Sequence, residues 1–124
     1  HQDLYSGLNE LMSRLMAEGL FESTLVVVLS EMSRTPKLND AAGKDHWPVT
    51  SGLVLGADVR GGQVFGGTDD GQNALPTNLS TGKPDDALDT RITSANFVAG
   101  ILNQLGVAPE SYFPGVTPLS GFVG

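Results

Sequence analysis

The sequence predicts an α/β protein in which a mostly parallel sheet is covered by helices. Three observations predict this class: an amphipathic helix over residues 3–18, a continuous apolar run within residues 24–30, and a second amphipathic helix over residues 94–105. A helix that leads into a fully apolar strand is typical of an α/β layer, because strands covered on both faces lose their polar–apolar alternation. The chain has 124 residues, 40% of them hydrophobic, which is enough for one modest core.

The first helix is predicted from a single apolar stripe. Asp3 is suited to cap its start, and Gly19 stands where a left-handed C-terminal cap is usual. The stripe residues recur at a spacing of three and four, which places them on one helix face for packing against a core. They are Leu4, Leu8, Leu11, Met12, Leu15 and Met16.

The apolar run of residues 24–30 is predicted to be a central strand that needs neighbours on both sides. Two weaker strands are predicted over 53–55 and 63–65, around a tight Arg-Gly-Gly turn. These are too few to complete a sheet around a doubly covered strand. We therefore expect residues 1–124 to be either a single domain that forms a homo-oligomer through its sheet edge or exposed apolar surface, or the C-terminal fragment of a larger domain whose N-terminal half is missing.

The second half of the chain is predicted to contain one helix after a long excursion. Residues 66–91 are rich in Gly, Asp, Asn, Thr and Pro, and we expect them to form an extended surface excursion. The helix over 94–105 follows and ends at Gly106, and the tail over 112–124 is too rich in Pro and Gly for helix. The apolar face of this helix consists of Phe97, Val98, Ile101, Leu102 and Leu105.

Composition excludes several classes of function. Fourteen acids against seven scattered bases give a net charge of −7, so no basic patch is expected for nucleic-acid binding. The absence of cysteine excludes disulfides and thiolate metal sites. No apolar run approaches the roughly 20 residues that a membrane span needs. The phosphate-binding and serine-nucleophile sequence signatures are also absent.

Residues 32–48 form a predicted long loop that contains the candidate metal ligands. Ligands of open parallel sheets collect beyond the carboxyl ends of strands, and Glu31 stands one residue past this strand end. Asp45 and His46 lie in the loop, where they can fold back beside Glu31. A carboxylate with an imidazole suits zinc, manganese or iron, whereas an all-oxygen set suits magnesium or calcium.

Each of these candidate residues also has a structural interpretation. Glu31 can pair with Arg34 or Lys37, and His46 can pack on Trp47. Arg34 in such a loop is suited to bidentate binding of a phosphate or sulfate group, or it can clamp Glu31 and hold the loop in shape. The two adjacent acids in the glycine-rich segment 66–71 favour a solvated turn over a calcium site, because the alternating acids of a calcium loop are missing.

Four segments of the chain are distinctive: SEMSRTP over 30–36, GKDHWP over 43–48, RGGQVFGGTDDG over 60–71 and ITSANFVAGILNQLGV over 92–107. Together they resemble the bacterial domain-of-unknown-function family 1501, which is placed in the alkaline phosphatase and sulfatase superfamily. Family members have a strand followed by an S-E-F-G-R-T-P-like turn and a G-R-D-H-W-P-like segment. In this chain these segments read SEMSRTP over 30–36 and GKDHWP over 43–48. RGGQVFGGTDDG over 60–71 resembles the family's glycine-rich turn, and ITSANFVAGILNQLGV over 92–107 resembles its late helix.

The resemblance implies a partial three-layer α/β/α domain with a mostly parallel sheet, similar to alkaline phosphatases and sulfatases. Glu31 matches the acid of an acid–histidine pair, Met32 stands where the histidine of that pair is usual, and His46 matches a later histidine. The implied function is hydrolysis of small phosphate or sulfate esters through a divalent-metal site only partly present here. The implied nucleophile lies upstream, so the isolated chain is expected to be inactive, and the implied location is periplasmic or secreted. The alternative is a non-catalytic binding or scaffold module.

Overall fold

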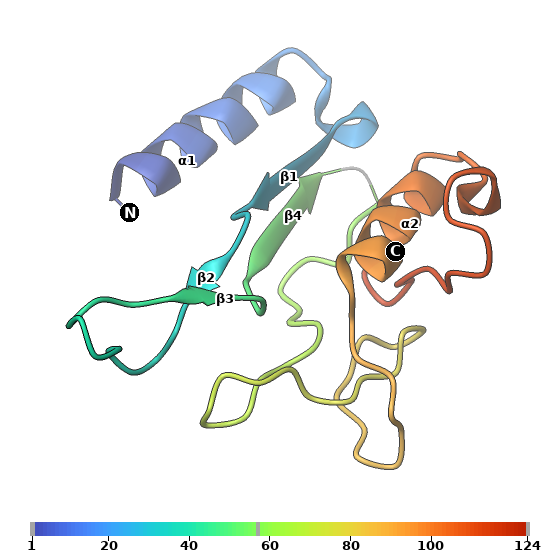
Figure 1. The fold of residues 1–124 in the computed structure, drawn as a ribbon. Coiled ribbons are helices and arrows are strands. Elements are labelled where there is room, and N and C mark those ends of the chain that lie inside the picture. Colours follow the sequence, from blue (N-terminus) through green and yellow to red (C-terminus); the bar gives the residue numbers. More distant parts are fainter. Residues whose placement is uncertain (1, 57, 124) are drawn as a thin grey trace.

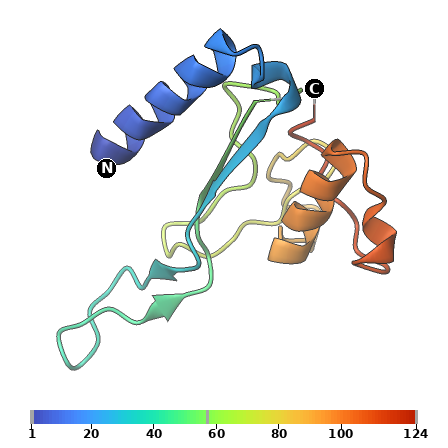
Figure 2. The same cartoon turned by 90° about the horizontal axis from the view of Figure 1, so that it is seen from above.

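The computed structural model describes residues 2–56 and 58–123, which form two helices, four short strands and two 3-10 turns. The ribbon of β1 and β4 lies between α1 on one side and the part of the chain that contains α2 on the other (Figures 1 and 2). The elements are α1 (Gln2–Ala17), η1 (Phe21–Ser23), β1 (Leu25–Leu29), β2 (Ser33–Arg34), β3 (His46–Trp47), β4 (Gly52–Gly56), α2 (Ser94–Gln104) and η2 (Pro109–Ser111).

Helix α1 confirms the predicted first helix, but none of its residues is buried. Gly19 adopts a positive φ of 68°, and the Leu20 amide donates to the Leu15 carbonyl at 2.8 Å, which closes the end of the helix in the expected left-handed cap. Leu8, Met12 and Leu15 are only half-buried. Several other large apolar side chains of α1 are exposed: Leu4, Tyr5, Leu11 and Met16. The stripe therefore lacks the core against which it was expected to pack.

A strand forms over 25–29, but it has one neighbour instead of two in the described residues, and the prediction of a mostly parallel sheet in a three-layer α/β/α arrangement is wrong. β1 pairs with β4 in antiparallel register, with Val27 opposite Val54, and the second sheet pairs β2 with β3, also antiparallel. A parallel neighbour needs a crossover of a dozen or more residues, usually a helix. Residues 30–51 contain no helix, and the chain instead turns back on itself as a hairpin.

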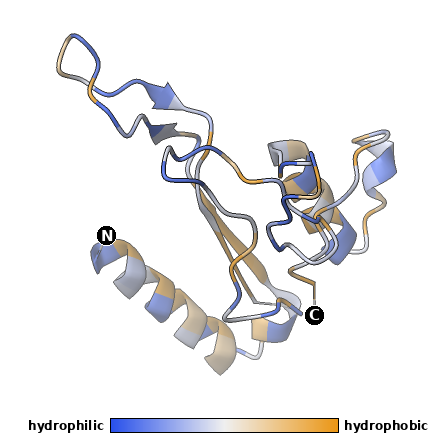
Figure 3. Ribbon diagram, turned by 90° about the horizontal axis from the view of Figure 1, so that it is seen from below, coloured by the Kyte–Doolittle hydropathy of each residue, from blue (hydrophilic) through white to orange (hydrophobic). Residues whose placement is uncertain are grey.

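Both faces of the β1–β4 ribbon are apolar, which explains why the sequence suggested a doubly covered strand. Paired residues of an antiparallel ribbon share a face, and the faces alternate along each strand. Figure 3 shows the apolar character continuing along both strands. One face carries Val26, Val28, Leu53 and Leu55, and the other carries Leu25, Val27, Leu29 and Val54.

The predicted long loop over 32–48 is largely the outer part of this hairpin. Three residues join β1 to β2, whereas four residues, beginning with Pro48, join β3 back to β4. The returning side therefore has one extra residue, as at a bulge, and Pro48 has no amide hydrogen to donate there. Beyond this point the turn that connects β2 to β3 projects away from the rest of the molecule (Figure 2).

The predicted strand over 53–55 lies within β4, but the predicted strand over 63–65 does not form. The side chain of Phe65 instead packs edge-on against Phe122, with ring centroids 6.3 Å apart. Residues 58–93 contain no strand, only isolated bridges such as Thr68 with Ala74 and Thr77 with Pro84. Within 66–91 the structure buries Leu79 and Thr77.

The core lies in the C-terminal half of the chain. Helix α2 begins at a capping box in which the side chains of Thr93 and Asn96 accept from each other's backbone amides, and this confirms the predicted second helix. The buried centre consists of Leu79, Leu119 and Phe122, with Phe65, Ile92, Phe97, Ile101 and Val123 packed around it. No helix in the described residues is long and apolar enough to cross a membrane.

Candidate functional site

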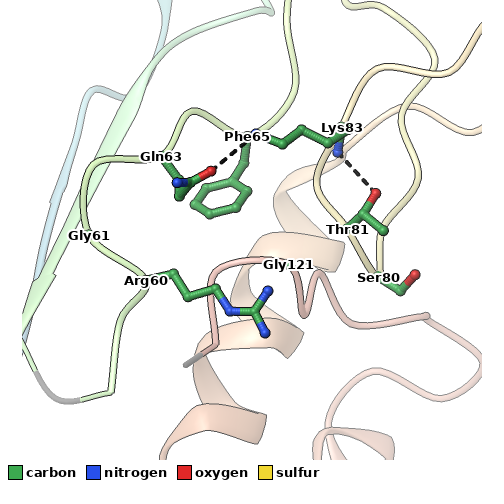
Figure 4. Close-up of a pocket in the computed structure, with 8 residues that line it drawn as sticks. All are labelled: Arg60, Gly61, Gln63, Phe65, Ser80, Thr81, Lys83 and Gly121. Carbon is green, nitrogen blue, oxygen red and sulfur yellow. Dashed lines mark hydrogen bonds between the residues drawn. The ribbon is translucent and has the colours of Figure 1, made fainter.

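Three separate segments of the C-terminal half meet around a pocket of about 540 Å³. Two positively charged side chains, Arg60 and Lys83, line this pocket from different loops. In Figure 4 the Lys83 side chain extends toward Gln63, past the Phe65 ring, and the Arg60 side chain extends toward Gly121. The remaining lining is neutral: no carboxylate lines this pocket. Its residues are Arg60, Gly61, Gln63, Phe65, Ser80, Thr81, Lys83 and Gly121.

The segment 60–65 is fixed to the core at both ends. The Arg60 amide donates to the Phe122 carbonyl at 2.9 Å, and the Gly66 amide donates to the Gly82 carbonyl at 2.8 Å. Between these bonds, Phe65 packs against the buried Phe122 ring. Backbone bonds and a buried aromatic contact therefore determine where the side chain of Arg60 starts.

The segment 80–83 is a loop that Asn78 organises. The Asn78 side-chain oxygen accepts from the Ser80 amide at 3.0 Å, the Ser80 hydroxyl at 2.7 Å and the Thr81 amide at 3.2 Å. The Asn78 backbone amide donates to the Lys83 carbonyl at 3.0 Å. An asparagine that bonds the residues after it is a common way to fix a turn, and here it sets the position of Lys83.

Two glycines allow the three segments to approach each other. Gly82 has a φ of 69°, and a Cβ at this position would overlap the Phe65 ring. A Cβ at Gly121 would lie 2.6 Å from the backbone nitrogen of Gly82. Because no real Cβ makes contacts this short with backbone, any larger residue at Gly121 would push the loop of Ser80 and Thr81 away from the pocket.

The pocket is locally positive although the chain as a whole carries a net charge of −7. The Lys83 ammonium donates to the side-chain oxygen of Gln63 at 3.2 Å and lies 6.0 Å from the centroid of the Phe65 ring. In the described part of the chain the one ion pair joins Arg14 and Glu10, so neither pocket cation is neutralised by an acid. Arginine and lysine with nearby hydroxyl groups suit a tetrahedral oxyanion.

The predicted site residues lie elsewhere, on the projecting hairpin. Arg34 is directly opposite His46 in the β2–β3 pair, and its guanidinium donates to the Lys44 carbonyl at 3.3 Å. Asp45 accepts from the Asn39 side chain at 2.8 Å. The structure thus places Arg34 beside His46 and not in an ion pair with Glu31.

Glu31 and Asp45 are exposed, as is His46. Residues 2–56 and 58–123 contain no group of three or more acids or histidines arranged to hold a metal ion. A second cavity of about 480 Å³ lies at the base of the hairpin, and none of the four predicted site residues lines it. Binding of a metal by Glu31, Asp45 and His46, and of an anion by Arg34, stays a prediction.

The acidic turn in segment 66–71 has a structural role that the geometry makes clear. Asp69 accepts from the Asn73 amide at 2.8 Å and from the Asn73 side chain at 3.0 Å, which closes the turn bounded by the bridge between Thr68 and Ala74. The side-chain bond from Asn73 and then its backbone bond hold the pKa of Asp69 below its ordinary value. The carboxylate therefore holds the turn together.

Sequence reasoning missed the pocket because its two cations are far apart along the chain. Arg60 and Lys83 are separated by 23 positions and count among the scattered bases, with no charge cluster to mark them. The available signal was local: Arg60 precedes two glycines, and Lys83 stands between a glycine and a proline. Basic residues in two such turns are candidates for a shared site only once the turns are known to meet.

The fold and pocket define a small domain of helices and antiparallel strands with a cationic cavity in its C-terminal half. The model of the family described as "Protein of unknown function (DUF1501)" matches residues 2–119. The chain therefore belongs to this family. Neither the curated proteins nor the solved structures gave a match.

Proposed function

We propose that this chain binds small phosphate or sulfate esters in the pocket of Arg60 and Lys83. The observation that carries the proposal is that two cations line one cavity whose lining contains no carboxylate, and that neither has an ion-pair partner among the described residues. Arg60 supplies a planar set of donors for two oxygens of the anion, and Lys83 supplies a point charge. Ser80 and Thr81 also line the cavity, with the Ser80 hydroxyl donating to Asn78 and the Thr81 hydroxyl accepting from the Lys83 amide.

Hydrogen bonds within the protein fix the loops that carry the two cations, which favours binding. The loop of Lys83 is held by the bonds to Asn78, and the segment of Arg60 is held by the bond to Phe122. Less backbone ordering is then needed when the anion binds, so more of the electrostatic attraction contributes to affinity. The anion displaces Gln63 as the acceptor for the Lys83 ammonium, which exchanges a neutral partner for a charged one.

Titration calorimetry with inorganic phosphate and with phenyl phosphate tests this function. Arg60→Gln and Lys83→Gln each remove one charge from the pocket and should each weaken binding about tenfold or more, since a hydrogen bond to a charged group contributes roughly 1.5–3 kcal/mol. Arg14→Gln is the matched control, because it removes the same charge from the exposed surface of α1. Equal weakening by all three substitutions would show a general charge effect and would contradict a pocket.

Hydrolysis of phosphate or sulfate esters at the hairpin, separate from the pocket, is a second candidate function that the resemblance to phosphatases and sulfatases suggests. It requires a nucleophile and a complete metal site, and we propose that the hairpin residues Glu31, Asp45 and His46 contribute ligands to that metal in a protein exported from the cytoplasm. We expect this chain by itself to show no turnover. The alternative is a module that binds the ester without hydrolysing it.

Metal titration distinguishes a metal-dependent ester hydrolase from a module that binds the ester without hydrolysing it. If the hairpin supplies metal ligands, zinc or manganese should bind to the chain and His46→Gln should weaken that binding, with anion affinity at Arg60 and Lys83 measured in parallel. Magnesium and calcium, titrated in the same way, test an all-oxygen set. Anion binding without any metal binding would leave the non-catalytic module as the function.

A further inference from the structure

The second cavity lies where the base of the hairpin meets the turn of Asp69. The indole nitrogen of Trp47 donates to the Gln72 carbonyl at 2.8 Å and joins these two parts of the chain. The cavity has a volume of about 480 Å³, within the range of roughly 300–1,000 Å³ that small-molecule sites occupy. The residues that line it come from the segments 30–33, 49–51 and 68–72.

The lining of this cavity is polar but uncharged. Five of its eight residues carry a hydroxyl group and one carries a carboxamide, and none of the eight is an acid or a base. A hydroxyl group both donates and accepts hydrogen bonds, and so does a carboxamide. Such a lining matches a ligand that presents donors and acceptors of its own without a net charge.

The hydroxyl groups differ in the bonds that they already make. Ser30 donates to the Met32 carbonyl at 2.8 Å, and Ser33 donates to the Val49 carbonyl, so their oxygens can still accept. Three other lining residues have side-chain hydroxyls that bond to no group in residues 2–56 and 58–123: Thr50, Ser51 and Thr68. These three are exposed, so a ligand can replace the water around them.

Gln72 is held in an unusual conformation beside the cavity. Its φ is 61°, a region that residues other than glycine seldom adopt and that costs free energy. Its amide donates to the Asp69 carbonyl at 2.9 Å, and its carbonyl accepts from Trp47, so both backbone groups are bonded. Strained residues that their surroundings hold in place cluster at ligand-binding sites.

The charges near the cavity disfavour an anion. Glu31 lies in the chain between two lining residues, and Asp69 and Asp70 lie between Thr68 and Gln72, whereas no base lines the cavity. A metal ion is disfavoured too, because the described residues contain no group of three acids or histidines that could hold one. An uncharged ligand is therefore the best match.

We propose that this cavity binds a small neutral polyhydroxyl compound of the monosaccharide class. Each hydroxyl of such a ligand donates and accepts, as the lining does. Its ring also presents C–H groups, which suit the half-buried residues Met32 and Val49. The two cavities share no lining residue, so this inference does not depend on the anion pocket.

The single tryptophan of the chain provides the measurement. Because the Trp47 indole bonds to Gln72, a ligand that contacts Gln72 should change the Trp47 fluorescence. The probes are glucose, galactose and mannose, and at least one of them should give a change that saturates. The corresponding uronate, with a carboxylate in place of the primary alcohol, should bind more weakly because of the nearby acids.

Variants from different segments of the lining locate the binding. Ser51→Ala and Thr68→Val each remove one hydroxyl and should each weaken sugar binding about fivefold. Ser6→Ala, at an exposed position of α1, is the matched control and should leave it unchanged. Gln72→Gly should also weaken binding while the chain stays folded, because glycine adopts this φ without strain.

The absence of a saturable fluorescence change with all three sugars would overturn the proposal. Unchanged affinity in Ser51→Ala, Thr68→Val and Gln72→Gly would overturn it as well, because the sugar would then bind elsewhere on the chain. Tighter binding of the uronate than of its parent sugar would contradict an uncharged ligand.

Discussion

The two halves of the molecule differ in how they bury their apolar residues. The C-terminal half closes around Phe122, which is 2% exposed, and fixes its loops to this centre through backbone bonds. The N-terminal half has a well-formed helix and a ribbon of two strands, yet neither α1 nor β1 contains a fully buried residue. The local sequence pattern is enough to form a helix or a strand. A buried core forms only where apolar surfaces of different elements pack against each other.

This difference separates the half that positions the pocket from the half that has no buried centre. The half with a core fixes the loops of the pocket of Arg60 and Lys83, as the proposed binding site requires. The half without a core leaves apolar residues of α1 exposed. Substitutions matched between the halves test this division.

The largest difference should come from truncating one apolar side chain in each half. Phe122→Ala removes a buried ring that contacts Phe65 and Phe97, and it should lower the free energy of unfolding by about 3–5 kcal/mol. Met16→Ala, at a side chain that is 59% exposed on α1, should change it by less than about 0.5 kcal/mol. Chemical denaturation of both variants gives the values, and similar losses would contradict a core confined to one half.

A second comparison uses one glycine from each helix. A Cβ at Gly100 of α2 would overlap the backbone carbonyl of Leu119, so Gly100→Ala should destabilise the protein by about 1–3 kcal/mol. Gly7 of α1 has no atom within 4 Å of the same position, so Gly7→Ala should stabilise it by about 0.5–1 kcal/mol through helix propensity. The opposite signs are the expected result, and thermal unfolding followed by circular dichroism measures them.

A smaller effect is expected where the hairpin contacts the second half. The indole nitrogen of Trp47 donates to the Gln72 carbonyl at 2.8 Å, which joins β3 to the turn of Asp69. Trp47→Phe removes this bond and should lower the free energy of unfolding by about 1 kcal/mol. Tyr5→Phe, on an exposed ring of α1, is the control and should leave it unchanged. A larger loss from Tyr5→Phe would show that α1 is more firmly packed than the structure describes.

The smallest effect concerns the acidic turn. Because the pKa of Asp69 is lowered in the folded protein, its contribution to stability is present above the ordinary value of 3.8 and is lost as the pH falls through the lowered pKa. Hydrogen exchange at the Asn73 amide should therefore speed up at acid pH beyond the intrinsic pH dependence. Asp69→Asn should abolish this additional change, and an unaltered pH response in the variant would contradict the role of the carboxylate.

The helices could be predicted from the sequence because their signals are local. Gly19 and the pair Thr93 and Asn96 mark helix ends within a few residues of the turns that they cap. The direction of the sheet could not be predicted, since it depends on whether residues 30–51 cross over or turn back, and a continuous apolar strand fits both. The family was recognised from short segments, whereas the expected parallel architecture was not found.

The pocket could not be predicted because it depends on contacts between distant residues. Gly121 brings the tail against the loop of Gly82, and only this approach places Lys83 near Arg60. The sequence instead drew attention to Glu31, Arg34 and His46, whose neighbours in the chain resemble a family motif. The structure brings together Arg34 and His46 of that set.

A residue-resolved phosphate titration tests the central claim most directly, because it observes the pocket and the hairpin in the same experiment. With isotope-labelled protein and nuclear magnetic resonance, the amides of 60–65, 80–83 and Gly121 should shift together and saturate as phosphate is added, while those of β2 and β3 stay in place. Saturable shifts at Arg34 and His46 with the pocket amides unmoved would contradict the account.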